Sequence, residues 1–486
     1  MAFPQTTAVE LEKILASSAA ASDAWGATSP SARAKALTAI ADALDEAAPD
    51  LIPTAQRETH LAEARLQSEL KRTTFQLRLF AEVLDEGSYL DSRIDPADAQ
   101  WPMGALRPDL RRVLIPLGPV VVFAASNFPF AFSTAGGDTA SALAAGCSVV
   151  LKVHSGHPDL SEATGRVITG ALAAAGAPSG LFSLVFGTDA GRIALTDARV
   201  KAGSFTGSIS AGRTLLDLAN SRPEPIPFFA EMGSVNPVFV TRSAAANRGE
   251  EIAQGFIGSV ASSAGQLCTK PGVLLVPEES DILAHLSSQS LPAPGPLLNE
   301  RILTGFMESL KQMTAHPGVK VLAETAGTAD QLPTSAILVT TVEDLLQDPD
   351  TLLAECFGPA SLVVTYQDEA QLTAVARVLE GQLTATVHGE ADDDVQDLVQ
   401  LLAKRAGRLL WNQWPTGVSV TYAQQHGGPY PATSASHSTS VGTAAITRFL
   451  RPVAYQGFPQ NLLPDAIRDE NPLGVPHRIN GRLGGE

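Results

Sequence analysis

The chain has 486 residues, of which 44% are hydrophobic, and its 51 acidic and 34 basic side chains give a net charge of −17. This length is too great for one ordinary hydrophobic core and predicts at least two domains, while the negative charge argues against binding to nucleic acids or membrane surfaces as a main role. No signal segment and no apolar run long enough to cross a bilayer is visible, so we expect a cytoplasmic protein.

The N-terminal residues show an amphipathic, alanine-rich pattern that is typical of a helix. From residue 112, apolar runs of strand length alternate with helical patterns. Strands are expected within 111–126 (two strands), 147–153, 180–187, 200–207 and 226–232, and helices over 133–146, 159–176, 189–198 and 208–220. This alternation predicts a parallel sheet with helices on both faces. Such sheets bind ligands at the carboxyl ends of their strands.

A second alternating region follows and predicts a second α/β unit of about 190 residues. Its strands are expected over 236–241, 272–277, 360–366, 383–389 and 407–412, with helices over 248–265 and 369–381. Residues 277–350 are richer in proline, serine and acidic residues and are expected to form surface helices. The tail after residue 460 is rich in proline, glycine and charge, and is expected to contribute little to a core.

Three cysteines are too few for a disulfide framework in a chain of this length, and none has a CxxC or CxxH neighbour that would indicate a zinc site. Cys147 and Cys356 are expected to be packing residues. Cys268 differs, because it lies in the sequence GQLCTKPG with Lys270 two residues later. A nearby ammonium and free backbone N–H groups favour the thiolate. Cys268 is therefore a candidate nucleophile, although this segment alone is also compatible with a packing role.

The usual dinucleotide fingerprint, GxGxxG after the first strand, is absent. The sequence FTGSISAG instead places Gly207, Ser208 and Gly212 between a predicted strand and a predicted helix. A turn of this kind can present N–H groups and a helix N-terminus to a diphosphate. An ordinary strand–helix turn explains the same pattern equally well.

Several motifs occur in order along the chain: ASNFPFAFSTAGGDTASALAAGCSVVLK, FTGS, EMGSVNP, GQLCTKPG and ECFGP, with Glu231 placed 37 residues before Cys268. Together they resemble the aldehyde dehydrogenase superfamily over nearly the whole chain. The sequences LANSRPEPIPFFAEMGSVNPVF, WPTGVSVTYAQQHGGPYPAT and SVGTAAITRFLRPV are similar to its branch of NADP-linked α-ketoglutaric semialdehyde (2,5-dioxopentanoate) dehydrogenases.

The resemblance implies an α/β fold with two Rossmann-like, three-layer α/β/α domains and a small oligomerisation arm. The N-terminal region with the dinucleotide-binding domain is expected over 1–231, with an arm strand near 98–118. The catalytic domain carrying Cys268 is expected over 232–428, and 429–486 would return to the cofactor domain and the arm. The resemblance also implies a homodimer or homotetramer.

Catalytic roles follow from the resemblance for Cys268, Glu231, Asn127 and Lys152. Cys268 would attack the aldehyde carbon as a thiolate and form a thiohemiacetal. The Asn127 side chain and the Cys268 backbone N–H would stabilise the oxyanion. Glu231 would be the general base that hydrolyses the following thioester. Without the resemblance, Asn127 is equally compatible with a turn cap, and Glu231 with a solvated loop carboxylate.

For the cofactor, the resemblance favours NADP, with NAD as the alternative, and no metal. Ser155 stands where many NAD-linked relatives have a glutamate that would repel a 2′-phosphate, and a hydroxyl can donate to that phosphate. His154 and His157 are interpreted as turn residues rather than metal ligands, and a solvated helical arginine is the more ordinary interpretation of Arg192. The expected cofactor-binding residues are Lys152, Ser155, Arg192, Gly207, Ser208, Gly212, Glu355 and Phe357.

The expected reaction converts a small-molecule aldehyde, 2,5-dioxopentanoate, to 2-oxoglutarate. The 2-oxo acid end of this substrate calls for a cation or several N–H donors, yet no arginine lies immediately after Asn127 or around Cys268. Apolar pocket walls would also suit a medium- or long-chain aliphatic aldehyde. A catalytically inactive nucleotide-binding scaffold is the alternative outside enzymes. The expected substrate-pocket residues are Phe128, Phe132, Gln266, Thr269, Trp414 and His426.

Overall fold

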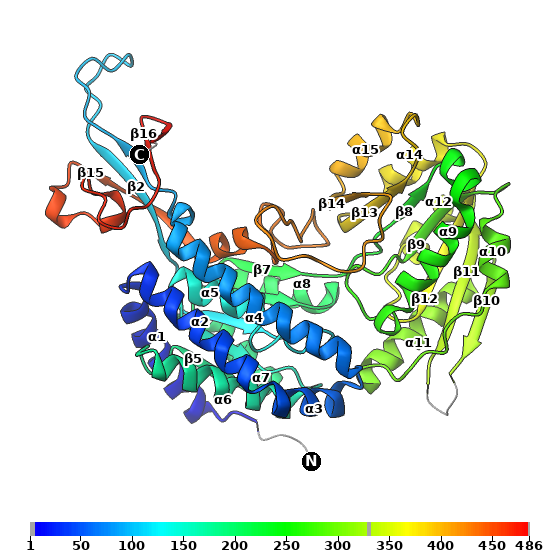
Figure 1. Ribbon diagram of the computed structural model, residues 1–486, viewed down its shortest axis with the longest axis horizontal. Coiled ribbons are helices and arrows are strands. Elements are labelled where there is room, and N and C mark those ends of the chain that lie inside the picture. Colours follow the sequence, from blue (N-terminus) through cyan, green and yellow to red (C-terminus); the bar gives the residue numbers. More distant parts are fainter. Residues whose placement is uncertain (1–4, 328–331, 485–486) are drawn as a thin grey trace.

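The computed structural model describes residues 5–327 and 332–484, which form two α/β units and a projecting β arm (Figure 1). Each unit is built on one sheet, and the arm is built on a third. In Figure 1 the first unit lies below the arm, and the second unit, coloured green to orange, lies beside the first. None of the helices in the described residues is both long and apolar enough to span a membrane.

The first sheet has the strand order β5-β4-β3-β6-β7, and all of its strand pairs are parallel. Its strands are β3 (Val120–Phe123), β4 (Val149–Lys152), β5 (Phe182–Val185), β6 (Ala202–Thr206) and β7 (Phe228–Glu231). The helices of this unit are α1 (Ala8–Gly26), α2 (Pro30–Glu46), α3 (Ala48–Thr59), α4 (Glu63–Glu86), α5 (Gly137–Ala145), α6 (Pro158–Ala174), α7 (Thr188–Thr196) and α8 (Ile209–Asn220), with the 3₁₀ turn η1 (Ser88–Leu90).

Helices cover both faces of this sheet, as the sequence alternation predicts. Successive side chains of a strand point to opposite faces. Val120 and Val122 of β3 therefore pack in the core that includes α2, α4, α5 and α6. Val121 and Phe123 pack in a separate core with α1, α7 and α8. Continuous apolar strands are required here because both faces of the sheet are buried.

The second sheet has the order β10-β11-β12-β9-β8-β13-β14 and is parallel except for the β10–β11 pair. Its strands are β8 (Val238–Val240), β9 (Val273–Pro277), β10 (Lys320–Ala326), β11 (Thr334–Thr341), β12 (Ala360–Tyr366), β13 (Gln382–His388) and β14 (Ala406–Trp411). Its helices are α9 (Arg242–Ala261), α10 (Ile282–Ser288), α11 (Glu300–Ala315), α12 (Val342–Gln347), α13 (Pro349–Leu352), α14 (Ala370–Val378) and α15 (Gln396–Ala403), with the 3₁₀ turn η2 (Ser262–Gly265).

The expectation of surface helices over residues 277–350 is incomplete, because strands β10 and β11 also lie there. Ala336, Ile337 and Leu338 of β11 are almost fully buried. Their apolar run is short and is surrounded by polar sequence, so composition averaged over the region hides it.

The arm sheet has the order β15-β2-β1-β16-β17. Its strands are β1 (Arg93–Asp95), β2 (Leu110–Pro116), β15 (Leu450–Gln456), β16 (His477–Ile479) and β17 (Arg482–Gly484), and the 3₁₀ turns nearby are η3 (Thr443–Phe449), η4 (Gln460–Leu462) and η5 (Asp465–Ile467). The expectation that the tail adds little core is wrong, since Leu463 and Ile467 are buried in the core of the first unit. The predicted boundaries after residues 231 and 428 stay predictions.

Candidate active site

Cys268 lies in a turn between η2 and β9, and its side chain is half-buried. Ser263, Ala264 and Gly265 have φ angles of 50°, 51° and 70°, a conformation that is unfavourable for residues other than glycine. At Gly265 an added Cβ atom would lie 2.0 Å from the Gly358 carbonyl oxygen, so only glycine fits there. This close approach fixes the loop that carries the thiol.

Two buried side chains hold the same loop from within the second unit. Asn236 Nδ2 donates to the carbonyl oxygens of Cys268 at 2.8 Å and Lys270 at 2.9 Å. Lys270 Nζ donates to the carbonyl oxygens of Cys356 at 2.6 Å and Ala360 at 2.5 Å. The expectation that the Lys270 ammonium favours the Cys268 thiolate is therefore wrong, because this ammonium binds backbone carbonyls.

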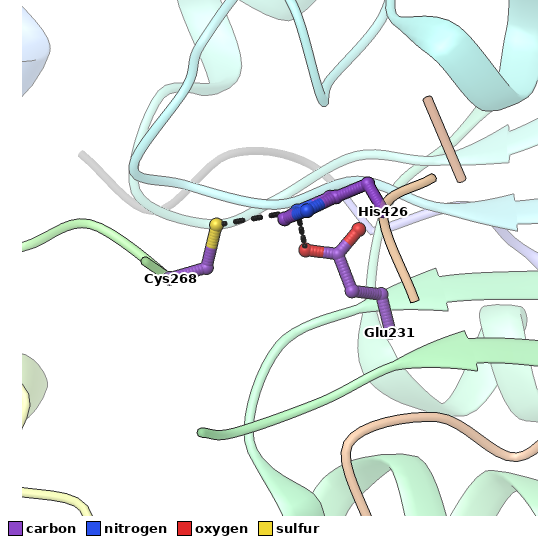
Figure 2. Close-up of side chains that lie close together, drawn as sticks. All are labelled: Glu231, Cys268 and His426. Carbon is purple, nitrogen blue, oxygen red and sulfur yellow. Dashed lines mark hydrogen bonds and ion pairs between the residues drawn. The ribbon is translucent and has the colours of Figure 1, made fainter. Parts of the chain in front are cut away.

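Cys268, His426 and Glu231 form one cluster (Figure 2). His426 Nε2 lies 3.5 Å from Cys268 Sγ and 2.9 Å from Glu231 Oε1. Glu231 ends strand β7, whereas His426 lies in the loop after β14, and both side chains are buried. The Ser440 hydroxyl donates to the other carboxylate oxygen of Glu231. One imidazole nitrogen thus contacts both the thiol and the carboxylate.

The two acids of the cluster, Glu231 and Cys268, have different protonation states. Burial raises the pKa of Glu231, but the charge and hydrogen bond of His426, together with hydrogen bonds from Ser440 and the thiol, outweigh burial and lower this pKa overall. Burial raises the pKa of the Cys268 thiol well above its ordinary value, and the charges of Glu231 and Glu355 add to this rise. Near neutral pH the resting forms are therefore a carboxylate and a protonated thiol. The thiol needs a base, and His426 Nε2, which donates its own proton to Glu231, is in position to relay the thiol proton to that carboxylate.

The raised pKa predicts how the free enzyme reacts with an alkylating reagent. Only the thiolate is alkylated, so the rate at Cys268 should rise by roughly tenfold per pH unit between pH 7 and 9 without reaching a plateau. Peptide mass spectrometry after timed exposure to iodoacetamide measures this rate. Cys147 and Cys356, which are buried, serve as internal controls. A plateau below pH 8 would show that the thiol is ionised at rest.

The two hydrogen-bond donors predicted for the oxyanion hole lie on or beside the Cys268 loop. Asn127 Nδ2 donates to the carbonyl oxygen of Gln266 at 3.1 Å, which brings this amide to the Cys268 loop and leaves its second N–H available. The carbonyl oxygen of Asn127 accepts from Arg65 Nη2 at 2.7 Å. Across the described parts of the chain, the Cys268 backbone N–H donates to no acceptor. The oxyanion role of these two donors stays a prediction.

Positive charge is concentrated at the carboxyl end of β4. Lys152 ends this strand, and burial, followed by the charge of Arg301 on α11, lowers its pKa. Burial and nearby cations also lower the pKa of His154 to about 3, so this imidazole is neutral. Ser155 follows in an exposed turn. Cations that repel one another in this way favour an anionic ligand. Sequence reasoning missed Arg301 because it belongs to the second unit.

The turn between β6 and α8 is partly engaged in structure. The Gly207 N–H donates to the Glu231 carbonyl oxygen at 3.0 Å, so the prediction that this N–H is free for a diphosphate is wrong. Ser208 caps α8 by accepting from a backbone N–H of the first turn. An added Cβ at Gly212 would lie 2.6 Å from Met232 Sδ, so this glycine permits close packing of the helix on the sheet. The N-terminus of α8 remains the feature that a diphosphate can use.

The other cofactor candidates lie on both units. Burial raises the pKa of Glu355 to about 7, and the Glu355 charge acts on the Cys268 thiol, which places this carboxyl near the cluster. Phe357 follows and is half-buried. Arg192 is exposed on α7. The preceding glycine of α7 approaches the Lys152 side chain closely, so Arg192 belongs to the helix beside the β4 cations.

Two aromatic residues of the predicted pocket lie near His426, and their contact with a substrate stays a prediction. The ring of Phe132 lies 5.3 Å from that of Phe128 and 6.2 Å from that of His426. Phe128 also lines a cavity of about 680 Å³, together with Leu267, the residue before Cys268. His426 is therefore both a neighbour of the predicted pocket and a member of the buried cluster. Its sequence context did not reveal that it belongs to the cluster.

Two further residues predicted to line the pocket, Gln266 and Thr269, have side chains that are buried in the protein. The side-chain amide of Gln266 donates to the Ser263 carbonyl oxygen and accepts from the Leu298 N–H. Its side chain therefore fixes the Cys268 loop, although Gln266 does border the cavity. Thr269 is buried, with an exposed fraction of 2%. Contact of either side chain with a substrate stays a prediction.

Trp414 lies elsewhere. Its ring packs 4.8 Å from the ring of His388 and 5.9 Å from that of Phe256, within the core beneath α9. Thr416 and Gly417, which follow Trp414 in the chain, line the cavity, whereas Trp414 is not among the described residues that line it. Contact of Trp414 with a substrate stays a prediction.

Comparison with known proteins extends these observations. The aldehyde dehydrogenase family profile matches residues 1–450. Alpha-ketoglutaric semialdehyde dehydrogenase 2 of Azospirillum brasilense is 45% identical over 471 residues, covering 95% of this chain and 89% of that protein. Alpha-ketoglutaric semialdehyde dehydrogenase of Acinetobacter baylyi is 42% identical over 491 residues, covering 99% and 93%.

Two solved structures share the fold. The 1-pyrroline-5-carboxylate dehydrogenase from Thermus with bound NAD has a TM-score of 0.78 at 18% identity, over 93% of this chain and 86% of that chain. A mutant of Bradyrhizobium japonicum proline utilization A has a TM-score of 0.79 at 21% identity, over 93% of this chain and 45% of that chain. At these identities the likeness concerns the fold alone.

Proposed function

The chain belongs to the aldehyde dehydrogenase family, and on this basis we propose that it oxidises 2,5-dioxopentanoate (α-ketoglutaric semialdehyde) to 2-oxoglutarate through a covalent intermediate on Cys268. The observation that carries the proposal is the contact of His426 Nε2 with both Cys268 Sγ and Glu231 Oε1. Two relatives with this activity in their names, 45% and 42% identical, support the substrate.

The first step is activation of the thiol. At rest His426 Nε2–H donates to the Glu231 carboxylate, so the Cys268 proton passes to Nε2 as the proton already there moves to Glu231 Oε1, which releases it to solvent before the later steps. The sulfur then bonds to the aldehyde carbon, and the aldehyde oxygen becomes negatively charged. Asn127 Nδ2 and the Cys268 N–H donate to this oxygen, and loss of one such donor typically raises a barrier by roughly 3–4 kcal/mol.

The second step produces the acid. Lys152, Ser155 and the N-terminus of α8 would hold NADP, which would supply the hydride acceptor, and loss of hydride from the thiohemiacetal carbon leaves a thioester on Cys268. A water molecule must then attack the thioester carbon, and Glu231 takes a proton from that water. The carboxylate product leaves and the thiol is restored. The low pKa of Glu231 keeps this base ionised at neutral pH. A carboxylate poised to activate water favours hydrolysis over transfer of the acyl group to a second thiol.

The preference for NADP over NAD is supported by charge at the end of β4. Lys152 and Arg301 are mutually repelling cations there, and Ser155 occupies the turn that follows. A 2′-phosphate would relieve this repulsion and accept a hydrogen bond from the serine hydroxyl. Residues near the nicotinamide would include Glu355 and Phe357, with the diphosphate at the N-terminus of α8.

Ser155→Glu is expected to lower the ratio of kcat/KM with NADP to kcat/KM with NAD by about tenfold or more, because like charges placed together are strongly unfavourable. The measurement is steady-state oxidation at fixed aldehyde with each cofactor. Ser155→Gln, which has a similar size and no charge, should change the ratio much less. If Ser155→Glu leaves the ratio unchanged, Ser155 does not face the 2′-position.

The substrate is tested by NADPH formation with 2,5-dioxopentanoate, succinic semialdehyde, glutaraldehyde and hexanal, each with NADP and NAD. We expect the highest kcat/KM with 2,5-dioxopentanoate. Because no metal is predicted, turnover should survive dialysis against EDTA. This test is informative because Glu231, Cys268 and His426 offer ligand atoms within 4.8 Å of one another. A higher kcat/KM with hexanal would indicate that the substrate is an aliphatic aldehyde. Inactivity with every aldehyde would support an inactive scaffold.

We also propose a homodimer or homotetramer that uses the arm. Ile479 and Leu483 of the arm are 42% and 63% exposed. Leu409 and Trp411 are exposed on β14, which is an edge strand of the second sheet. Open sheet edges with exposed apolar side chains are typical of surfaces that pair with another chain. The cytoplasmic location stays a prediction.

A further inference from the structure

The 2-oxo acid end of the proposed substrate requires a cation, and helix α4 supplies one near the thiol. Arg65 and Arg72 lie two turns apart on α4, so they share one face of the helix. The Arg65 guanidinium lies 4.9 Å from the centre of the Phe128 ring, and that of Arg72 lies 5.4 Å from the centre of the Phe132 ring. This face of α4 therefore lies along an aromatic wall formed by Phe128 and Phe132, and Arg65 and Phe128 border the cavity that Leu267 also lines.

Arg72 is incompletely satisfied. Its Nε donates to the Val418 carbonyl oxygen at 3.3 Å. Within residues 5–327 and 332–484, neither Nη1 nor Nη2 of Arg72 has a hydrogen-bond partner, and both atoms are closed to solvent. A buried cation with unpartnered donors is strongly unfavourable. The four N–H bonds of these two nitrogens form a fork that fits a carboxylate.

Charges within the protein do not balance this cation. Glu69 is the acidic neighbour on α4, but it lies 3.4 Å from Arg65, and its Oε1 accepts from the N–H groups of Phe130 and Ala131. One carboxylate thus faces two guanidinium groups. Among the described residues, Nη1 of Arg65 and both Nη1 and Nη2 of Arg72 have no hydrogen-bond partner, so Arg72 has the larger number of free donors.

A second nearby guanidinium is engaged elsewhere. Arg408 donates to the carbonyl oxygens of Pro415 at 2.7 Å and Gly417 at 3.0 Å. Those bonds fix the loop that borders the cavity. Arg408 is therefore a weaker candidate for a substrate ligand than Arg72.

Arg72 is also close to the chemistry. The negative forms of Cys268 and Glu231 act on its pKa, opposing the lowering caused by burial. The Phe132 ring lies between Arg72 and the cluster: its centre is 5.4 Å from the Arg72 guanidinium and 6.2 Å from the centre of the His426 ring. The five-carbon chain of the substrate spans roughly 5 Å from aldehyde to carboxylate carbon. When the length of its hydrogen bonds is added, the substrate is long enough for its aldehyde to lie at Cys268 while its carboxylate lies at Arg72, on the other side of the Phe132 ring.

We propose that Arg72 binds the carboxylate of the 2-oxo acid end while the aldehyde carbon lies at Cys268, and that it thereby selects ω-oxo 2-keto acids over uncharged aldehydes. This inference rests on the proposed function. Because the Phe132 ring covers the guanidinium, the carboxylate reaches Nη1 and Nη2 as this ring turns aside. The unpaired cation lowers the stability of the free enzyme and is neutralised when the acidic substrate binds.

The test compares Arg72→Met and Arg72→Lys with wild type, using 2,5-dioxopentanoate and hexanal at saturating NADP. For Arg72→Met we expect kcat/KM for the keto acid to fall by about 100-fold or more, mainly through KM. The fall with hexanal should be far smaller. Arg72→Lys should recover part of the loss, since it keeps the charge without the fork. Arg78→Met is the matched control, because Arg78 lies on the same helix but pairs at the surface with Asp42 and Asp45.

Two further measurements separate binding from a structural role. Arg72→Met should melt at the same temperature as wild type or higher, because it removes an unpaired buried charge. In the wild type, 2-oxoglutarate should compete with hexanal, and Arg72→Lys should weaken this inhibition. Equal losses with both aldehydes, or an unchanged ratio between them, would overturn the role of Arg72. A wild type that ignores 2,5-dioxopentanoate would instead overturn the proposed substrate, and this inference with it.

Discussion

Cys268→Ala is expected to lower aldehyde oxidation by at least about 10⁴-fold, because removal of a nucleophile that forms a covalent intermediate has effects of this order. His426 and Glu231 stay in place in this variant, but neither replaces the sulfur that bonds to the aldehyde carbon. Binding of NADP should be nearly unchanged, since the thiol is not expected to hold the cofactor. NADPH absorbance gives the turnover, and a fluorescence titration with NADPH gives the affinity.

Cys147→Ala is the matched control for this experiment. The Cys147 thiol is fully buried, with Sγ 3.5 Å from the Phe449 carbonyl oxygen, and burial raises its pKa to about 11. It lies outside the cluster, so turnover should persist. A Cys268→Ala enzyme that works within about tenfold of the wild-type rate would contradict the nucleophilic role.

His426→Gln is expected to slow the first turnover by about 10²–10⁴-fold, the range typical of a lost general base. The reason is the raised pKa of the Cys268 thiol, which leaves little thiolate unless a base removes the proton. Stopped-flow absorbance should therefore show a slow first release of NADPH. Raising the pH toward 9 should restore part of the rate, because hydroxide then forms the thiolate. Glu231→Gln should keep a faster first release and lose mainly the later turnovers.

His437→Gln is the control for this second experiment, because His437 is exposed on the same long loop as His426. Its first turnover should match that of the wild type. If His426→Gln released NADPH as fast as wild type in the first turnover, the thiol would not depend on His426. Glu231, whose carboxylate oxygen lies within 4.8 Å of the thiol, would then be the remaining candidate for the base of that step.

The parallel sheets could be predicted from sequence because their strands are buried on both faces and are therefore apolar throughout. Val120–Phe123 and Val149–Lys152 are examples, and both lie within strands that the apolar runs predict. Strand β11 was missed because its apolar core is short and its surroundings are polar. The burial of Ile467 could not be predicted either, since it depends on the tail returning to the first unit.

The candidate site was predictable where function depends on local sequence. Cys268 and Glu231 stand in motifs whose neighbours mark them. The contact between His426 and Glu231 joins residues 195 positions apart, and only the packing of the two units brings them together. Lys270 shows the converse limit, because closeness in sequence does not determine where a side chain points. Its ammonium binds carbonyl oxygens on the far side of the loop.

Arg72 was missed for a similar reason. The acid end of the substrate calls for a cation, but no arginine lies near Asn127 or Cys268 in the sequence. Arg72 lies on α4, before the alternating region begins, and reaches the aromatic wall by helix packing. Its helical neighbours give no sign of this role, because Arg78 on the same helix is an ordinary surface residue.

In the proposed reaction the aldehyde carbon becomes bonded to Cys268. The direct measurement is mass spectrometry of acid-quenched Glu231→Gln enzyme after mixing with 2,5-dioxopentanoate and NADP, followed by peptide mapping. We expect an acyl group, formed with release of one NADPH per site, on the peptide that contains Cys268. NADPH release without any adduct on that peptide, or an adduct on another residue, would contradict it.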